Sequence, residues 1–464
     1  MAISYNPDMS RTDALFARLP LGAQHAAVSA FGASWAWSRF GPGFRRHLAD
    51  FQARDDWDAA AWADYTARVV ADLTSAAVSR VPYYRETYDR GQRADARAGH
   101  LEGLPLLEKA PLRLDPERFV DPVLRPRHPR IFLTSGSSGT PIATIWSTDE
   151  LRASMAIREA RSARWAGTSF RLPRATFSGR MVEPDPDSTG PFYRFNAAER
   201  QIYLSAFHLR PDTAAAYVNA FRRHRIQWGT GYAVSFALLA QFILDAGIEP
   251  LSLRAVVTTS EKLTAKMRQR ISAAFGCPVF EEYAAVENAF FASECAHGSL
   301  HVSPDAGVLE ILRPDGSPAD PGELGEVVVT GLLRTVQPLI RYRIGDTAMW
   351  APDPCTCGRG MPVIAEVGGR TEDVLIGPDG RQLVRFHGVF VGLEQVVEAQ
   401  VIQETLNQFR ILVVPDKGFC DDDAAEMVIR MRQRLGDVSV QIQRVDRIQR
   451  SNSGKFQAVI SKLK

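Results

Sequence analysis

The stretch that decides the fold is residues 253–287, LRAVVTTSEKLTAKMRQRISAAFGCPVFEEYAAVE. It begins with an apolar, β-branched run at 253–259 and continues at 262–275 with apolar residues at helical spacing. It then returns to a short apolar run at 278–282. This alternation of strand and helix predicts an α/β fold with a substantially parallel sheet.

The same pattern extends toward the N-terminus. Helical segments are expected at 214–223 and 233–246, and a further helix at 150–165. Residues 131–147 are an apolar run, a loop of small hydroxyl residues and glycines, and a β-branched run, which predicts strand, loop and strand. Residues 1–100 have apolar residues three and four apart, which is typical of helices.

The C-terminal third has a different character. Residues 300–350 contain short β-rich runs with Pro/Gly turns, and residues 375–464 mix helix and strand. Because single hydrophobic cores stop growing at about 250–300 residues, at least two domains are expected. We predict a large multi-layer N-terminal domain, residues 1–371, with mostly parallel sheets plus a β-rich layer. A small α+β C-terminal domain, residues 372–464, should follow.

Composition limits the function classes. The formal net charge of +2 does not match a nucleic-acid binder, which needs a concentrated basic face. No stretch reaches about 20 uninterrupted apolar residues, so no membrane span is expected. The most apolar early stretch, Leu21–Trp37, is interrupted by polar residues and predicts a buried helix. The first residues lack a basic start and an apolar core, so a cytoplasmic location is expected.

Four motifs carry candidate chemistry. The loop from Thr134 to Thr140, TSGSSGT, combines glycines and hydroxyls that suit a phosphate, although a plain Ser/Gly turn is equally consistent. In the segment EEYAAVE, an aromatic ring could stack on a base and Glu287 could hold Mg²⁺, or the segment could be a solvated acidic loop. Asp346 follows a glycine and could accept ribose hydroxyls, or lie on a surface turn.

The fourth motif is Ser451-Asn-Ser-Gly-Lys455 near the C-terminus. Only seven of the 55 basic residues are lysines, so a lysine here is more informative than usual. A lysine on a flexible loop can place one compact charge on a reacting oxygen. The alternative is a solubilising terminal lysine.

A possible zinc set is formed by two loops. Cys295, His297 and His301 lie on one, and Cys355 and Cys357 on the other. Zinc prefers four sulfur or nitrogen ligands, and structural sites use three cysteines and one histidine readily. The alternative is unpaired thiols in a reducing compartment. The other cysteines, at 277 and 420, are interpreted as ordinary core or surface residues.

The order of the motifs adds a resemblance. TSGSSGTP, VVTTSEKL, EEYAAVE, GELGEVVVT, RYRIGD, GGRTED and SNSGK follow one another as in the adenylate-forming superfamily of acyl-CoA synthetases. The phrases SAFHL, CTCGRGMP and SGKFQAVIS are similar to the CapK-like branch of the phenylacetate–CoA ligase group. The resemblance covers roughly residues 100–464, whereas the first hundred residues match weakly.

The resemblance implies a small C-terminal domain that is mobile. It implies that ATP and a carboxylate give acyl-AMP and pyrophosphate, after which the acyl group passes to a thiol, usually coenzyme A. An amine, a hydroxyl or a carrier-protein thiol are alternative acceptors. A non-catalytic nucleotide-binding relative is the alternative from another class.

The resemblance also implies roles for individual residues. Lys455 and Glu287 would be catalytic, with Glu287 holding Mg²⁺, and Glu372 would be the hinge, with Asp373 as its alternative. His301 is preferred over His297 as the zinc ligand. The implied nucleotide-binding residues are Thr134, Ser135, Gly136, Ser137, Ser138, Gly139, Thr140, Ser260, Glu261, Glu282, Tyr283, Asp346 and Arg370.

The acyl pocket is expected to be apolar and aromatic, which favours an aryl acid over a long alkyl chain. For His208 the alternative is a satisfied core histidine. Ala284 and Val286 depart from the family pattern, which usually has glycine and a hydroxyl residue, and indicate a changed substrate. The residues expected to face the acid are Phe207, His208, Gly231, Tyr232 and Ala284.

Overall fold

The computed structural model describes residues 16, 19–134, 142–178, 182–183, 188–370, 375–378, 382–383, 389–390, 393, 395–449 and 456–463. Its largest element is a 12-stranded sheet in the order β11-β12-β13-β14-β10-β9-β8-β7-β6-β3-β5-β4. The five parallel strands are β3 (Arg174–Phe177), β5 (Gln201–Leu204), β6 (Trp228–Tyr232), β7 (Ala255–Thr259) and β8 (Val279–Ala284). The antiparallel strands are β4 (Tyr193–Asn196), β9 (Phe291–Glu294), β10 (Leu300–Val302), β11 (Gly307–Leu312), β12 (Leu324–Gly331), β13 (Tyr342–Trp350) and β14 (Val363–Arg370).

The α/β class is therefore confirmed, and the sheet is mixed. Parallel pairing is confined to β5-β3-β6-β7-β8, and the β-rich layer expected at 300–350 continues the same sheet through β9 and β10. Short loops explain the change in direction, because a parallel pair needs a long crossover whereas the turns after β8 join antiparallel neighbours directly.

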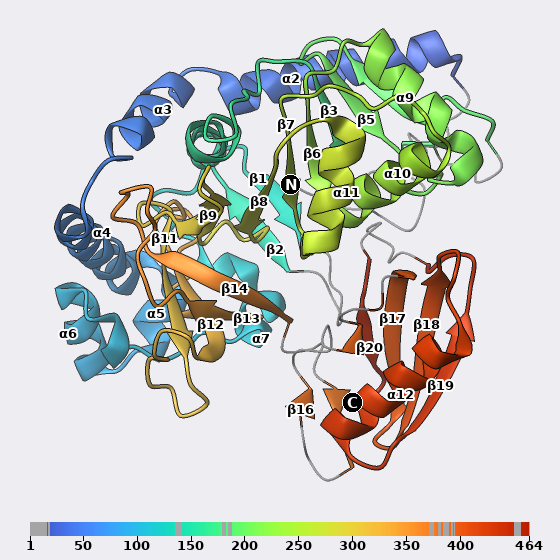
Figure 1. The fold of residues 1–464 in the computed structure, drawn as a ribbon. Coiled ribbons are helices and arrows are strands. Elements are labelled where there is room, and N and C mark those ends of the chain that lie inside the picture. Colours follow the sequence, from blue (N-terminus) through green and yellow to red (C-terminus); the bar gives the residue numbers. More distant parts are fainter. Residues whose placement is uncertain are drawn as a thin grey trace.

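The helices beside the parallel half are those that the sequence predicts, although the third begins at residue 265 and not at 262. They are α9 (Ala214–Arg223), α10 (Ala233–Asp245) and α11 (Ala265–Phe275), with a short 3₁₀ turn at Pro211–Thr213 before α9 (Figure 1). The hydroxyl of Thr264 caps α11 by accepting from the Met267 N–H at 3.2 Å, and Gly276 ends it in the left-handed conformation. Buried apolar residues of α9, α10 and α11 form one core with β3, β5, β6 and β7.

The loop motif at 131–147 is flanked as expected. It joins the antiparallel pair β1 (Arg130–Leu133) and β2 (Ala143–Trp146), which is followed by α8 (Thr148–Ile157) and a π-helical turn at Arg158–Ala163. The residues between the two strands, 135–141, lie outside the described part of the chain.

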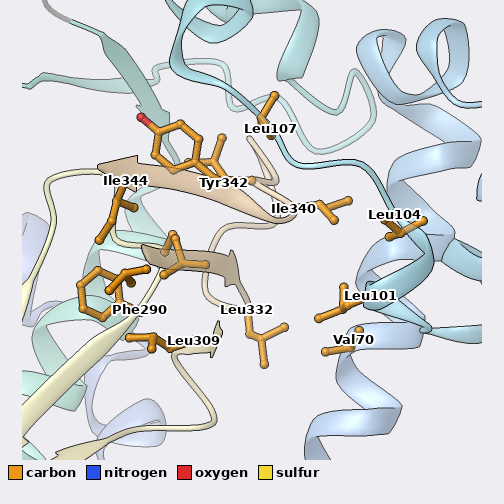
Figure 2. Packing of buried hydrophobic residues seen from close by; sticks show 14 of the residues in the cluster. Val70, Leu101, Leu104, Leu107, Phe290, Leu309, Leu332, Ile340, Tyr342 and Ile344 are labelled. Carbon is orange, nitrogen blue, oxygen red and sulfur yellow. The ribbon is translucent and has the colours of Figure 1, made fainter. Parts of the chain in front are cut away.

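Residues 21–98 are largely helical, as predicted for this part of the chain. The helices are α2 (Leu21–Phe40), α3 (Phe44–Ala53), α4 (Ala59–Arg80), α5 (Pro82–Thr87) and α6 (Arg90–Ala98), followed by Leu101–Gly103 (3₁₀), α7 (Lys109–Leu114) and Pro116–Phe119 (3₁₀). Side chains of α4 and of the 3₁₀ turn at Leu101–Gly103 pack against the β-rich half of the sheet. Figure 2 shows Val70, Leu101 and Leu104 facing Ile340, in the same core cluster as Tyr342.

The prediction that Leu21–Trp37 is a buried helix is wrong about burial. The segment is helical, but Phe31 is 56% exposed and Trp37 66% exposed. The helix packs on β4 through its small and polar face, where a Cβ at Gly32 would come within 2.3 Å of the Asn196 side chain. Phe31 and Trp37 are therefore exposed, whereas Trp35 of the same helix contacts Phe132.

The C-terminal region forms its own unit (Figure 1). Its four-stranded sheet has the order β19-β18-β17-β20, from β17 (Val396–Thr405), β18 (Gln408–Pro415), β19 (Ser439–Arg444) and β20 (Val459–Ser461). The helix α12 (Asp421–Leu435) covers it with Met427, Met431 and Leu435 in a separate core. A small ladder, β15 (Leu375–Ile376) with β16 (Gln382–Leu383), precedes it. The predicted boundary at 371/372 lies outside the described residues and stays a proposal.

None of the helices in the described part of the chain is long and apolar enough to cross a membrane.

Candidate active site

The predicted site residues gather at one edge of the sheet. Because β6, β7 and β8 are parallel neighbours, their carboxyl ends meet at the same edge. Tyr232 ends β6, Ser260 and Glu261 follow β7, and Glu287 follows β8. In open α/β sheets, ligands bind outside the carboxyl ends of the strands.

The backbone is strained where the chain leaves these strands. Ser260 has φ +70° and Asn288 has φ +53°, a left-handed conformation that costs a non-glycine residue about 1–2 kcal/mol. Gly231 has φ +130°, and a Cβ there would lie 1.8 Å from the Phe177 carbonyl oxygen, so only glycine fits. Such strain clusters at functional sites, where the surrounding structure holds it in place.

The residues predicted to hold adenine and ribose contact each other. The Tyr283 hydroxyl donates to Asp346 Oδ2 at 2.9 Å, and the Tyr283 ring lies 4.7 Å from that of Phe290. Asp346 is the ladder partner of Arg370 across β13 and β14, although the Arg370 side chain is outside the described atoms. The hydrogen bond ties the parallel half of the sheet to its antiparallel half at the site.

Glu287 lies in a buried environment that it shares with a second carboxylate, Glu150, and a guanidinium, Arg334. It is 8% exposed, and its Oε1 accepts from the Tyr342 hydroxyl at 3.1 Å. Arg334 is fully buried, and this burial lowers its pKa. The negative charges of Glu150 and Glu287 raise the pKa but do not fully offset the burial. Carboxylate oxygens are the ligands that Mg²⁺ prefers, so the residues fit the predicted magnesium role.

Two carboxylates predicted near adenine have protein partners. Glu282 forms a buried ion pair with Arg158, whose guanidinium lies over the Phe291 ring. Glu261 accepts at Oε2 from the Val234 N–H and at Oε1 from the Phe456 N–H, both at 2.9 Å. Their described role is therefore to hold protein segments, and a contact with adenine stays a prediction.

Several predicted residues lie outside the described part of the chain. These are Ser135, Gly136, Ser137, Ser138, Gly139, Thr140, Glu372, Asp373 and Lys455. Thr134 and Ile142 pair on either side of the predicted phosphate loop: the Thr134 N–H donates to the Ile142 carbonyl at 3.0 Å, and Thr134 Oγ1 accepts from the Ile142 N–H at 2.9 Å.

The predicted acyl-pocket residues lie at the ends of β5, β6 and β8. His208 is 2% exposed, its Nδ1 is hydrogen-bonded to Ser205 Oγ at 2.8 Å, and its ring stacks on Phe192 at 5.3 Å. These contacts favour the alternative of a satisfied core histidine. Phe207 is half-buried and Tyr232 is 4% exposed, whereas Ala284 packs beside the core of α3 and α8.

The two cysteine loops converge. Ligand atoms of Cys295, His301, Cys355 and Cys357 all lie within 4.8 Å of one another. Cys295 Sγ is 3.7 Å from Cys355 Sγ, and Cys357 Sγ is 3.3 Å from His301 Nε2. His297 is hydrogen-bonded to Thr356 at 3.0 Å, which supports the choice of His301.

In each of the two loops a backbone N–H group donates a hydrogen bond to a cysteine sulfur. The backbone N–H groups of His297 and Cys357 donate to the sulfurs of Cys295 and Cys355, both at 3.4 Å. Burial lowers the pKa of His301 to about 4, so its imidazole is neutral near pH 7 and keeps a lone pair. Three thiols and a neutral imidazole form a donor set that suits Zn²⁺.

Sequence reasoning missed Arg158, Arg334 and Tyr342. The two arginines carried no signal, because arginines are abundant in this chain and the sequence does not show which are buried. Tyr342 is part of the quoted motif RYRIGD, but only Asp346 was selected from it. Its role emerges because Tyr342 and Glu287 come together from segments 55 residues apart.

The chain is similar in sequence and fold to several known proteins. Residues 375–462 match the family model of the CapK C-terminal domain. Protein CapK of Staphylococcus aureus is 26% identical over 302 residues, 63% of this chain and 66% of that protein. A phenylacetate-coenzyme A ligase of Thermus thermophilus is 26% identical over 330 residues, 66% of this chain and 69% of the ligase.

Among solved structures, a 2-hydroxyisobutyryl-CoA ligase in complex with an acyl-AMP superposes with a TM-score of 0.68 at 18% identity. The match covers 88% of this chain and 91% of the ligase. The fold is thus that of the adenylate-forming ligases. By sequence, the chain is similar to CapK and to the phenylacetate–coenzyme A ligases.

Proposed function

We propose that this protein activates a small carboxylic acid with ATP and Mg²⁺ and then transfers the acyl group to a thiol, coenzyme A. In the first step a carboxylate oxygen bonds to the α-phosphorus of ATP, the α–β phosphoanhydride bond breaks, and pyrophosphate leaves. In the second, the thiolate sulfur bonds to the acyl carbon and AMP leaves. The observation that carries the proposal is the Tyr283–Asp346 hydrogen bond beside buried Glu287 at the carboxyl edge of the sheet.

The proposed roles follow from these positions. The Tyr283 ring would stack on adenine, Asp346 and Arg370 would hold the ribose, and Glu287 would hold Mg²⁺ against the phosphates. The loop 134–140 would bind phosphate oxygens. Lys455 would place its charge on the reacting oxygens of nucleotide and acid, which stabilises the transition state for acyl-AMP formation.

The test is pyrophosphate release with ATP, Mg²⁺ and a panel of carboxylic acids. We expect Lys455→Ala to slow acyl-AMP formation about 10²–10³-fold, the size typical of losing one preorganised charge contact. Lys417→Ala, another lysine of the C-terminal region, is the matched control and should retain the wild-type rate. Wild-type pyrophosphate release by Lys455→Ala contradicts the assignment. Nucleotide binding without turnover of any acid would identify a non-catalytic relative.

For the acid we propose an aryl substrate. Half-buried Phe207 after β5 and the Tyr232 ring at the end of β6 support an apolar, aromatic surrounding for the acyl group. Aryl acids should show the higher kcat/KM in the panel, and a preference for long-chain fatty acids contradicts this part of the proposal.

The acceptor and the moving domain belong to the same proposal. Coenzyme A should be acylated when it is added after the acid and ATP. An acceptor of another kind, a carrier-protein thiol, an amine or a hydroxyl, would be identified by adding it in place of coenzyme A. Because the two half-reactions need different groups around one nucleotide, we place the domain boundary at 371/372 with Glu372 as pivot.

We also propose that Cys295, His301, Cys355 and Cys357 bind a structural Zn²⁺. The protein supplies all four ligands of a tetrahedral site, which leaves no position for a catalytic water. Three zinc-binding thiols persist best in a reducing compartment, which supports a cytoplasmic location.

A further inference from the structure

Glu261 connects two parts of the molecule that lie far apart in the sequence. It lies two residues after the end of β7 and directly follows Ser260, whose backbone is left-handed. Its Oε2 accepts from the N–H of Val234 in the first turn of α10, and its Oε1 accepts from the N–H of Phe456. Phe456 lies three residues before β20, which pairs with β17 in the C-terminal sheet.

The nature of the two donors makes this contact depend on Glu261. Both are backbone N–H groups, so no other side chain is needed for either hydrogen bond. The neighbouring residue behaves differently: Lys262 forms an ion pair at 3.0 Å with Glu366, which belongs to β14 of the large sheet. Within the described residues, Glu261 therefore spans the two units while Lys262 stays within one.

The hydrogen bond between Glu261 and the Phe456 N–H lies next to the proposed catalytic lysine in the sequence. The Phe456 N–H belongs to the peptide bond that joins Phe456 to Lys455 in the sequence. A carboxylate that holds this N–H fixes the chain at the residue next to the proposed catalytic lysine. Hydrogen bonds from backbone N–H to a carboxylate are stronger than neutral ones.

We propose that Glu261 is a positioning residue that holds the C-terminal unit against the large sheet for acyl-AMP formation and releases it for thiol transfer. This rests on the proposed function. In the arrangement seen here, Phe456 is bound to the end of β7. A reorientation of the C-terminal unit for the second half-reaction breaks this bond and leaves the bond to α10 intact.

The kinetic test separates the half-reactions. For Glu261→Ala we expect the kcat of pyrophosphate release to fall about 10-fold with little change in the KM for ATP, the size of losing one charge-assisted hydrogen bond. Acylation of coenzyme A from supplied acyl-AMP should keep its rate. Glu261→Gln retains one acceptor oxygen, so its kcat of pyrophosphate release should lie between those of the wild type and Glu261→Ala. Lys262→Ala, which breaks only the contact within the large domain, is the matched control.

A second measurement does not need turnover. Hydrogen exchange should show faster exchange of the Phe456 amide in Glu261→Ala than in the wild type, and unchanged exchange in Lys262→Ala. Equal losses in both half-reactions, or unchanged protection of Phe456, overturn the proposal. If the wild type turns over no acid but Phe456 protection is lost in Glu261→Ala, the contact is upheld and the proposed function fails.

Discussion

Replacing Tyr283 by phenylalanine removes one hydroxyl from the proposed nucleotide site and leaves the ring. The hydroxyl donates to Asp346 at 2.9 Å, and both side chains are half-buried. Hydrogen bonds to charged groups contribute about 1.5–3 kcal/mol, and partial exposure reduces this to about 1–2 kcal/mol. Since Asp346 is proposed to hold the ribose, Tyr283→Phe should weaken AMP binding about 5–30-fold.

Calorimetric titration with AMP measures this without knowledge of the acid. Tyr342→Phe is the matched control: it removes the hydroxyl that contacts Glu287, and AMP binding without Mg²⁺ should be unchanged. A nucleotide that lacks both ribose hydroxyls should bind the wild type weakly and show no further loss in Tyr283→Phe, because the two perturbations act on one contact. Wild-type affinity of the variant for AMP, or an equal loss with both nucleotides, refutes the reasoning.

Two further outcomes are expected. Burial and the nearby charge of Glu294 raise the pKa of Glu281 to about 7, so this carboxyl contributes stability at low pH that is lost as the pH rises from about 4.5 to 7. Glu281→Gln should therefore be more stable than the wild type at pH 8, by at most about 3 kcal/mol, and not at pH 4. An equal difference in Tm at both pH values contradicts this. Cys355→Ser should lower zinc content and Tm without abolishing pyrophosphate release by the folded fraction, and elemental analysis without zinc in the wild type removes the metal site.

The fold was predictable where local signals are strong. Ala214–Arg223 is a helix with the predicted bounds, and the strands at 255–259 and 279–284 begin within two residues of their expected starts. The mixed direction of the sheet was harder to foresee, because an apolar run looks the same in a parallel and an antiparallel strand. The exposure of Trp37 was hidden for a similar reason: periodicity shows a helix, but small residues such as Gly32 decided which face packs.

For the site, the sequence identified residue types and missed their partners. Tyr283 and Asp346 were selected separately, for adenine and ribose, and the structure joins them through a hydrogen bond. Glu261 was selected as a nucleotide contact, yet its carboxylate holds backbone groups 27 and 195 residues away. Such partners depend on how segments meet in three dimensions, which motif order does not contain.

The N-terminal helices contact the candidate site region through a short segment, residues 158–163. Arg161, in the π-helical turn at Arg158–Ala163, is fully buried and forms ion pairs with Asp55, between α3 and α4, and with Asp305. The same turn supplies Arg158 to Glu282 on β8. Irregular turns of this kind are frequent at functional sites, because the extra residue re-aims neighbouring side chains.

The proposed zinc loops contact a residue next to the same segment. The Trp165 ring, just after the π-helical turn, contacts His301 at 5.9 Å and lies under the Arg359 guanidinium at 4.2 Å, while its indole N–H donates to Asp55 at 3.0 Å. The N-terminal helices, the cysteine loops and β8 are therefore mechanically linked through residues 158–165. Loss of the proposed metal should loosen the docking of the N-terminal helices before it alters the proposed nucleotide site, because Trp165 joins His301 to that docking whereas the Tyr283 hydroxyl is bonded to Asp346.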